Sequence, residues 1–534
     1  MAQLVTPPVV QPSRPLGTGF ATRRITLGEI EACHVSTFQK IWSSSDKKGV
    51  AFYKPVDIPP GYFILGHHCE CNTDCLQGWV VVTKDANENK ELGGSASLPP
   101  LVKPVDYSLV WSSESEKDKK GGNGFFWWPN APQGYKALGY LVTNGPEKPS
   151  LEELRCVRSD LTGVSKTGNN IWNKKDGTSS FQVWSTIPDP EKQANGVFAG
   201  TFFCTTNSES GISELPVACL INANSIPIGM PSLDDVHSII GKYGPTVFFH
   251  PKETYLPSSV PWFFENGALL YKKGSFTPDP IAEDGSNLPQ GGSADGEYWI
   301  DLPSNSAKAK IVRRGDLESA EAYVHVKSAL GGTFTDIVMW VFYPFNGPGT
   351  LAFFGLVFIP LGRIGEHIGD WEHVTLRVNN FTGELWAIYF SQHSGGQWIE
   401  AGDLEYVEGS KKAVVYSAKS GHANFPRAGL VLQGCGKLGV GIANSSKKSA
   451  YFLDTSKKYK IVAAEYLKGM ENCENVTEPA WLNYGRKWGP EIEYASSNLV
   501  GCVKLPSEVS GEDGPTGPKW KSSWYGDEKV KDVF

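Results

Sequence analysis

Short apolar segments alternate with Gly- and Pro-rich turns along most of the chain. In the second half this pattern predicts β-strands at residues 337–343, 351–359, 371–378, 385–392, 413–417 and 459–465. A brief helix is predicted at residues 232–242, where Ser232 is a suitable N-cap ahead of two aspartates. The chain is therefore expected to be mainly β with few short helices, and residues 235–505 suit a β-sandwich.

The first 220 residues contain an internal repeat. An aromatic strand motif that ends in Trp-Ser-Ser occurs around Trp42 and again around Trp111. A second motif, Pro-x-Gly-Tyr-x-x-Leu-Gly, follows at residues 59–66 and returns at 132–139. A degraded third copy includes Trp184. Two motifs in the same order at nearly equal spacing indicate a three-fold repeat.

Each repeat reads as an aromatic strand, a turn and a second strand. A repeated sheet unit cannot bury its apolar face alone, so three copies are expected to pack around a shared axis. We expect the space along that axis to be filled by the side chains of Trp42, Trp111 and Trp184. A three-fold, β-prism-like domain is thus expected ahead of the β-sandwich.

Changes in composition mark the expected domain boundaries. The start of the chain is rich in proline, and the residues after Pro506 are polar and expected to be loose. A short joining segment is expected at residues 225–235. The predicted organisation is a flexible N-terminus, a repeat domain, a sandwich domain and a polar tail, at residues 1–18, 19–225, 235–505 and 506–534.

Charge and hydropathy restrict the possible partners. The 534 residues carry a net charge of -7, which disfavours a dedicated nucleic-acid binder. No signal peptide and no transmembrane span are expected, so the ten cysteines are expected to be reduced in a cytoplasmic or peripheral membrane protein. The uncharged stretch at residues 337–362 reads as two strands joined by a turn, with a membrane-inserting hairpin as the alternative.

The run Gly-Glu-His-Ile-Gly-Asp-Trp-Glu-His at residues 365–373 is the strongest chemical signal. In a strand, Asp370 and Glu372 share one face, which the following apolar residues mark as buried. Buried carboxylates are costly unless they are paired or bind a metal. With His367 nearby, this donor set suits Mg²⁺ or Ca²⁺, and also Mn²⁺.

The alternative for these carboxylates is an ion-paired structural turn that uses Arg363 or Arg377. Three further histidines, His250, His393 and His422, follow or end predicted strands. Each alone is typical of a structural histidine, but together they could line one pocket.

Trp371, which lies between the two carboxylates, is a further candidate pocket residue. No nucleophile elbow and no phosphate-binding loop are found in the sequence.

The whole chain resembles the plant vacuolar protein sorting-associated family, the type numbered sixty-two in the yeast series. The segments that carry this resemblance are Gly-Phe-Ala-Thr at 19–22, Tyr-Lys-Pro at 53–55, the two repeated motifs, Leu-Pro-Ser-Ser-Val-Pro-Trp at 256–262 and Gly-Asp-Trp-Glu-His at 369–373. The family name implies a link to vacuolar trafficking.

The second half is also similar to the necrosis-inducing Nep1-like cytolysins, whose hallmark is Gly-His-Arg-His-Asp-Trp-Glu. Here His367, Asp370 and Glu372 keep the spacing of the residues that hold the metal in those proteins. The resemblance also places Asn346 at an acidic ligand position and His393 in a Ser-x-His strand end. The cytolysins are secreted and disulfide-linked, and neither property is expected here.

The expected function is a metal-dependent membrane-lipid or glycan binding protein. The expected partner is a glycolipid or glycan head group. A protein of this kind could also act on the membrane as a pore-forming, toxin-like defence protein. One alternative is a metal-dependent hydrolase, in which His367, His393 or His422 would act as the base. Another is a vacuolar trafficking scaffold with a merely structural site. Enzymatic activity is the less expected outcome.

Overall fold

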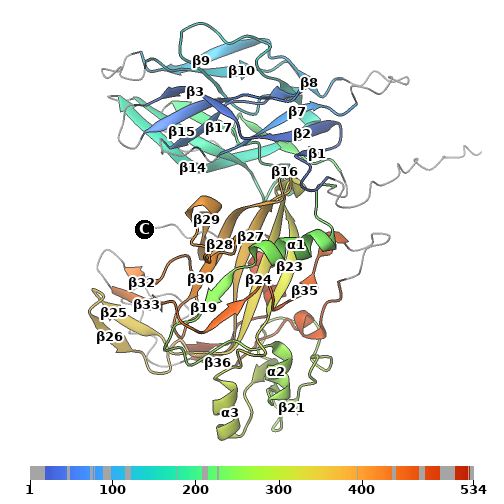
Figure 1. The fold of residues 1–534 in the computed structure, drawn as a ribbon. Coiled ribbons are helices and arrows are strands. Elements are labelled where there is room, and N and C mark those ends of the chain that lie inside the picture. Colours follow the sequence, from blue (N-terminus) through green and yellow to red (C-terminus); the bar gives the residue numbers. More distant parts are fainter. Residues whose placement is uncertain are drawn as a thin grey trace, which may run out of the picture. The chain divides into compact units, whose positions relative to one another are not determined.

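Short β-strands make up most of the regular structure in the computed structural model (Figure 1). The structure describes residues 19–44, 49–71, 76, 78–87, 98–114, 122–176, 179–206, 215–224, 228–393, 395–435, 440–467, 476–493, 511–526 and 528. The predicted flexible N-terminus lies outside these residues. The α-helices are short, namely α1 (Leu233–Tyr243), α2 (Val260–Glu265), α3 (Ser306–Val312) and α5 (Ser522–Tyr525). A mainly β chain with few short helices is confirmed.

The chain divides into two compact units. The first comprises Met1–Ser232 with Ser328–Thr335 and Asn379–Glu384, and the second comprises the remainder. The division after Ser232 falls inside the expected joining segment. Among the described residues, no helix has both the length and the apolar character that a bilayer span requires.

The first unit contains three three-stranded groups with the same order of strands along the chain. Their orders are β3-β4-β6, β9-β10-β12 and β14-β15-β17. The bounds are β3 (Phe38–Ser43), β4 (Val50–Pro55), β6 (His68–Cys71), β9 (Asp106–Ser112), β10 (Phe125–Asn130), β12 (Leu141–Thr143), β14 (Thr162–Asp176), β15 (Ser179–Pro188) and β17 (Phe202–Thr206). Each group falls in one predicted copy of the repeat, while the β-prism itself stays a prediction.

Shorter strands complete the first unit in the orders β1-β2-β7-β5, β11-β13-β8 and β16-β18-β14. Their bounds are β1 (Arg24–Thr26), β2 (Ile30–Val35), β5 (Phe63–Ile64), β7 (Val80–Asp85), β8 (Leu101–Val102), β11 (Tyr135–Lys136), β13 (Cys156–Arg158), β16 (Gly196–Val197) and β18 (Ala218–Ile221).

An aromatic cluster forms one core of this unit. The rings of Trp42 and Trp111 lie 6.3 Å apart, as the repeat predicts, and Trp172 lies 6.0 Å from each of them. Trp184 is partly buried and also packs against this cluster, as Trp111 does. The sequence did not single out Trp172, which is a buried member of the cluster.

The second unit is built around a six-stranded sheet with the order β29-β28-β27-β24-β23-β35. The bounds are β23 (Ala322–Ala329), β24 (Phe334–Asn346), β27 (His367–Asn379), β28 (Glu384–Gln392), β29 (Gly395–Glu400) and β35 (Tyr459–Ala463). The central strands β24 and β27 are buried along almost their whole length. Both faces of the sheet are therefore covered at its centre.

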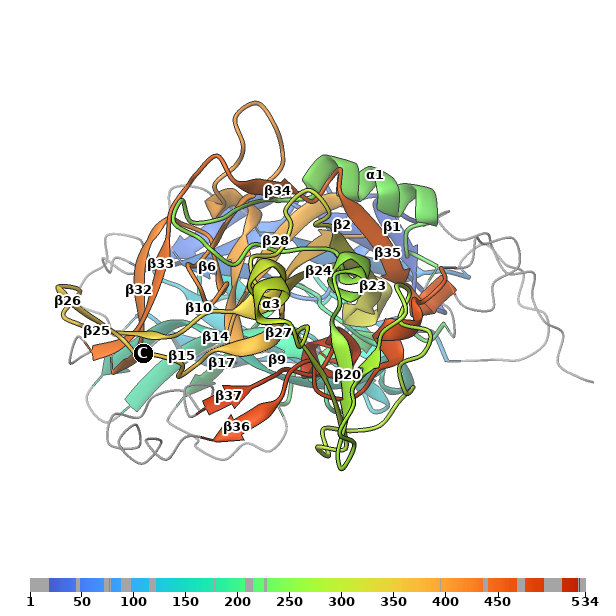
Figure 2. The same ribbon diagram turned by 90° about the horizontal axis from the view of Figure 1, so that it is seen from below.

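Smaller sheets complete this unit, in the orders β31-β30-β19-β34, β26-β25-β33-β32, β21-β20-β22 and β36-β37. Figure 2 shows them around the central strands. Their bounds are β19 (Thr246–Phe248), β20 (Leu269–Lys272), β21 (Asp279–Pro280), β22 (Tyr298–Asp301), β25 (Thr350–Phe353), β26 (Val357–Pro360), β30 (Val414–Ser417), β31 (Asn424–Phe425), β32 (Gly429–Cys435), β33 (Val440–Ser446), β34 (Phe452–Asp454), β36 (Glu491–Glu493) and β37 (Gly511–Asp513).

One predicted strand is divided in two. Residues 351–359 were expected to form a single strand, but β25 and β26 pair antiparallel across a turn at Phe354 and Gly355. Both turn residues have a positive φ, 52° and 66°. A lone glycine inside an apolar run is a weak turn signal, and this explains the error.

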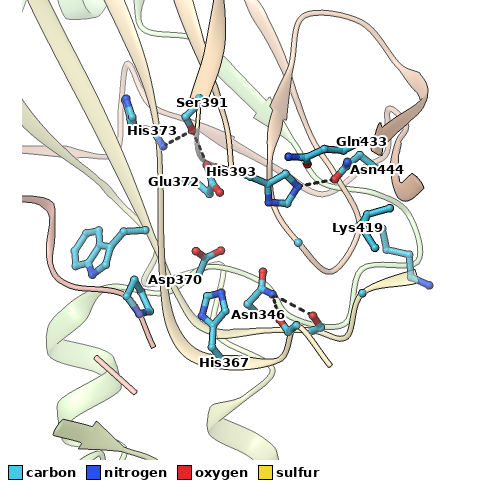
Figure 3. Close-up of a pocket in the computed structure, with 18 of the residues that line it drawn as sticks. Asn346, His367, Asp370, Glu372, His373, Ser391, His393, Lys419, Gln433 and Asn444 are labelled. Carbon is cyan, nitrogen blue, oxygen red and sulfur yellow. Dashed lines mark hydrogen bonds between the residues drawn. The ribbon is translucent and has the colours of Figure 1, made fainter. Parts of the chain in front are cut away.

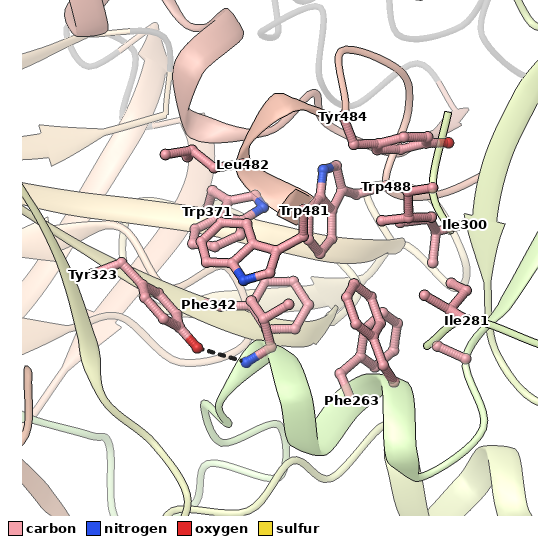
Figure 4. Close-up of a cluster of buried hydrophobic side chains, with 14 of the residues drawn as sticks. Phe263, Ile281, Ile300, Tyr323, Phe342, Trp371, Trp481, Leu482, Tyr484 and Trp488 are labelled. Carbon is pink, nitrogen blue, oxygen red and sulfur yellow. Dashed lines mark hydrogen bonds between the residues drawn. The ribbon is translucent and has the colours of Figure 1, made fainter. Parts of the chain in front are cut away.

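The polar tail contributes to the core of the second unit. Trp524 of α5 is 1% exposed and belongs to a cluster of buried aromatic residues that also contains Trp371, Trp481 and Trp488 (Figure 4). The expectation of a loose tail is therefore wrong for residues 511–526. Burial of the Trp524 side chain removes a large apolar area from water, and this stabilises the packed tail although the surrounding sequence is polar.

Candidate functional site

A cavity of about 490 Å³ opens in the second unit between the ends of the central strands. Asn346 reaches it from the end of β24, and His367, Asp370 and Glu372 reach it from β27. His393, just after β28, lies on the opposite side (Figure 3). The three predicted metal ligands and two of the predicted pocket residues thus face one space.

A glycine in β27 makes this arrangement possible. His367 and Asp370 are three positions apart and would point to opposite faces of a regular strand. Gly369 lies between them with a φ of 65°, which interrupts the alternation. A Cβ at this position would lie 2.7 Å from the carbonyl oxygen of Trp488, so the site requires a residue without a side chain.

A buried histidine holds Asp370 in place. The Nδ1 atom of His422 lies 2.8 Å from Oδ2 of Asp370, and its Nε2 atom lies 3.0 Å from the carbonyl oxygen of Tyr255. The His422 ring also stacks on Tyr343 with 3.9 Å between ring centroids. Both ring nitrogens of His422 therefore have an oxygen partner within hydrogen-bond distance.

The charge of Asp370 follows from its surroundings. Burial alone raises the pKa of this carboxyl, but the hydrogen bond from His422 and the nearby cations, Lys521 among them, hold the pKa below its usual value. Burial lowers the pKa of His367, and the Asp370 carboxylate opposes that shift. Nδ1 of His367 hydrogen-bonds to the carbonyl oxygen of Gly369 at 2.9 Å. Nε2 is therefore the ring nitrogen of His367 that would bind a metal ion.

Hydroxyl and amide groups orient the second carboxylate. The hydroxyl of Ser391 donates to Oε2 of Glu372, and the same hydroxyl oxygen accepts from the backbone N–H of His373 at 3.1 Å. The side-chain amide of Asn424 donates to Ser391 and to the carbonyl oxygen of His373. Glu372 is therefore held by Ser391 of β28, and Asn424 of β31 positions Ser391 in turn.

The amide of Asn346 has a defined orientation. Its Nδ2 atom donates to the carbonyl oxygens of Gly347 and Gly365, at 3.1 and 2.8 Å. Because both amide hydrogens have acceptors on the backbone, the side-chain oxygen is the atom left to face the cavity. Figure 3 shows this oxygen on the side of Asp370.

The remaining predicted pocket residues have different places. His393 lines the cavity and its Nε2 atom hydrogen-bonds to Asn444 at 3.0 Å. The ring of Trp371 belongs to the aromatic core, so this residue forms a wall and not a contact platform. His422 acts behind Asp370, and it is not among the lining residues. His250 is also not among them, and its Nδ1 accepts the N–H of Lys252.

The two arginines named for an ion-paired turn each contact a carboxylate outside the predicted ligand set. Arg377 forms an ion pair with Asp336, with N–O distances of 2.8 and 2.7 Å. Arg363 lies 3.9 Å from Glu366. His422 hydrogen-bonds to Asp370, and the Ser391 hydroxyl donates to Glu372. The ion-paired turn stays an alternative.

Sequence reasoning missed several lining residues. Lys521 and Glu528 come from the tail, and Lys419, Gln433 and Asn444 come from loops or strands of the smaller sheets. No local motif marks any of these positions, because they reach the cavity only through the tertiary fold. Ser391 did lie inside a recognised motif, as the residue two positions before His393.

The donor types around the cavity fit a hard divalent cation, which prefers carboxylate and amide oxygens together with imidazole. Within the described part of the chain, no three His, Cys, Asp or Glu side chains are close enough to form a metal-binding group. An ion held here would also use the Asn346 oxygen, or would draw the carboxylates together. The cation stays a prediction.

A family model matches nearly the whole chain, while the curated relative matches a part of it. A family model described as vacuolar protein sorting-associated protein 62 matches residues 2–528. The vacuolar protein sorting-associated protein 62 of Saccharomyces cerevisiae is 24% identical over 224 residues, which cover 39% of this chain and 45% of the yeast protein. The aligned region therefore spans less than half of that relative.

Several solved structures align with part of this chain. GNIP1Aa from Chromobacterium piscinae aligns over 39% of this chain and 40% of its own, with 19% identity and a TM-score of 0.29. Necrosis and Ethylene inducing Protein 2 from the causal agent of cocoa's Witches Broom disease aligns over 34% and 76%, with 17% identity and a TM-score of 0.16. NLPPya in complex with glucosamine aligns over 44% and 92%, with 17% identity and a TM-score of 0.17.

Proposed function

The chain belongs to the vacuolar protein sorting-associated protein 62 family, and we propose that it binds the glycan head group of a membrane lipid in the cavity of its second unit, with a divalent cation as cofactor. Mg²⁺ and Ca²⁺ are the expected ions, and Mn²⁺ is a further candidate. The family name makes the vacuolar membrane the proposed place of action.

The observation that carries this proposal is the convergence of Asp370, Glu372 and the Asn346 oxygen on one cavity of about 490 Å³. That volume lies within the range of roughly 300–1,000 Å³ typical of small-molecule sites. Carboxylates and amides are suitable acceptors and donors for sugar hydroxyls. A bound cation would stabilise the two buried carboxylates and offer further coordination sites to hydroxyl oxygens.

Two of the three candidate bases, His393 and His422, already form hydrogen bonds within the chain, which supports binding over hydrolysis and leaves His367 as the candidate base of the hydrolase alternative. Both ring nitrogens of His422 already face oxygen acceptors, and Nε2 of His393 bonds to Asn444. A general base needs a ring nitrogen within hydrogen-bond reach of the water that it activates. In this arrangement His422 positions Asp370 and does not act on a substrate.

Calorimetric titration of the full chain with soluble amino sugars, beginning with glucosamine, tests the proposal directly. Binding is expected in the presence of Ca²⁺ or Mg²⁺ and is expected to be lost after chelation. Asp370→Asn removes one charge of the cation site and should weaken binding at least about tenfold. The control is Asp279→Asn, at an exposed position of β21.

Sugar binding that survives both chelation and Asp370→Asn would contradict the proposal. Release of a cleaved product from a glycolipid, lost in Asp370→Asn, would favour the hydrolase instead. Membrane lysis is a separate expectation, and leakage of a dye from glycolipid-containing vesicles measures it.

A further inference from the structure

The hairpin of β25 and β26 exposes a continuous run of apolar side chains, and we call residues 350–360 the apolar ribbon. Phe354 and Leu356 in its turn are 72% and 83% exposed, and Val357, Phe358 and Ile359 each expose about half of their surface. The sequence carries no charge from Ile337 to Gly362. Figure 1 shows the ribbon at the rim of its unit. A patch of this kind on a folded protein marks an interaction surface.

Both faces of the ribbon are apolar, and this feature indicates what covers it. All four residues of β26 are exposed. Because side chains alternate, Val357 and Ile359 lie on one face while Phe358 and Pro360 lie on the other. A protein partner docked on one face would leave the second face in water. A lipid environment surrounds an inserted element and covers both faces at once.

The turn of the ribbon carries a second signal. Phe354 and Gly355 both have a positive φ, and the N–H of Leu356 donates to the carbonyl oxygen of Phe353 at 3.0 Å. The pairing of Phe353 with Val357 leaves three residues in the turn, and Phe354 is one of its two residues with a positive φ. A bulky aromatic residue is disfavoured in the left-handed region and is seldom placed there for folding alone. The Phe354 ring therefore has a role outside the folded chain.

We propose that the apolar ribbon inserts into the interfacial region of a lipid bilayer. The insertion is shallow, because β26 is the edge strand of its sheet and its outer backbone groups need water or head groups as partners. Interfacial elements of this kind lie roughly 5–10 Å below the surface. Arg363, whose side chain is 64% exposed, follows the ribbon and suits the phosphate level of the membrane.

The apolar ribbon extends from the edge of the cavity to the exposed turn. Thr350 at the start of β25 lines the cavity, and Phe353 at the other end leads into the exposed turn. Insertion of the turn would hold the cavity close to the membrane surface. The inference goes beyond the proposed sugar binding and is independent of it, since the ribbon needs neither a sugar nor a cation.

Flotation of the full chain with vesicles of phosphatidylcholine and phosphatidylserine, free of glycolipid and with chelator present, tests the inference. The unmodified chain is expected to float with the vesicles. Leu356→Glu should lower the partition coefficient by at least about tenfold, because burial of one leucine side chain is lost and a charge is added. Phe276→Glu is the matched control, since Phe276 is fully exposed outside the ribbon.

A second variant separates membrane binding from folding. Phe354→Asn places a residue that tolerates a positive φ at this position, so the chain should unfold at the same or a higher temperature while its partition coefficient falls. Asp370→Asn should float like the unmodified chain, whatever its effect on sugar binding. These two results together would support the ribbon as the contact surface.

Three outcomes would overturn the inference. The unmodified chain could fail to float, or Leu356→Glu could float as well as Phe276→Glu. Alternatively, size-exclusion chromatography could show a dimer of the unmodified chain that Leu356→Glu converts to a monomer. That last result would assign the ribbon to contacts between two copies of the chain.

Discussion

The cavity and the apolar ribbon lie at the two ends of β25. Both differ from an ordinary protein surface, the cavity because it buries charged groups and the ribbon because it exposes apolar groups. The cavity buries Asp370 and Glu372, whereas the ribbon exposes Phe354 and Leu356. The buried charges have partners inside the chain, His422 and Ser391. The exposed apolar groups point away from the fold. Changes at the cavity should therefore destabilise the protein, while changes at the ribbon should affect membrane binding more than stability.

The largest expected effect follows from removing the partner of Asp370. His422→Ala leaves a buried carboxylate without its hydrogen bond, which should lower the free energy of unfolding by about 3–5 kcal/mol. Urea denaturation measures this change. His250→Ala is the matched control, because His250 is partly exposed and should change stability by less than about 1 kcal/mol. Equal effects of the two variants would show that the cavity charges do not depend on their partners.

A second effect concerns Glu528, whose side chain is buried against His373 and Thr375. Burial alone raises the pKa of Glu528, but His373 and other partners lower it to about 2. The unfolded chain therefore binds this proton more readily than the folded chain. The resulting stabilisation, about 3 kcal/mol, is present above pH 4.5 and is lost as the pH falls toward 2.

Thermal unfolding between pH 2 and pH 6 tests this expectation. The variant Glu528→Gln should lose part of the acid sensitivity of the unmodified chain across this interval. Identical slopes in the two proteins would mean that Glu528 is not held in its charged form by the fold.

The smallest effect has the opposite sign and belongs to the ribbon. Phe354→Asn relieves a disfavoured left-handed residue and should raise the free energy of unfolding by roughly 1 kcal/mol. Differential scanning calorimetry measures the shift. A clear loss of stability would show that the Phe354 ring packs within the fold and would remove the contrast between the two regions.

The local sequence pattern was sufficient to predict many of the strands and part of the candidate site. The apolar runs located β24, β27 and β28, and the spacing of His367, Asp370 and Glu372 placed them around one space. Period-two alternation and a compact motif are local properties, so they can be recognised without the fold. Asn346 was identified through a family resemblance and not through its own chemistry.

The errors lie where tertiary packing decides between local alternatives. Trp172 and Trp184 both contribute to the aromatic cluster, and nothing local in the sequence indicates that Trp172 is the more deeply buried of the two. Lys521 and Glu528 join the cavity from a tail with no recognisable motif. His422 looked like a lining residue, but its place behind Asp370 depends on a loop that no spacing rule describes.

Gly369 carries a consequence for how this protein tolerates mutation. Every amino-acid substitution of a glycine introduces a side chain, and any Cβ here would meet the Trp488 carbonyl oxygen at 2.7 Å. The position thus has no conservative replacement. Each side chain that faces the cavity has chemically related substitutes, but the glycine that brings these side chains together has none.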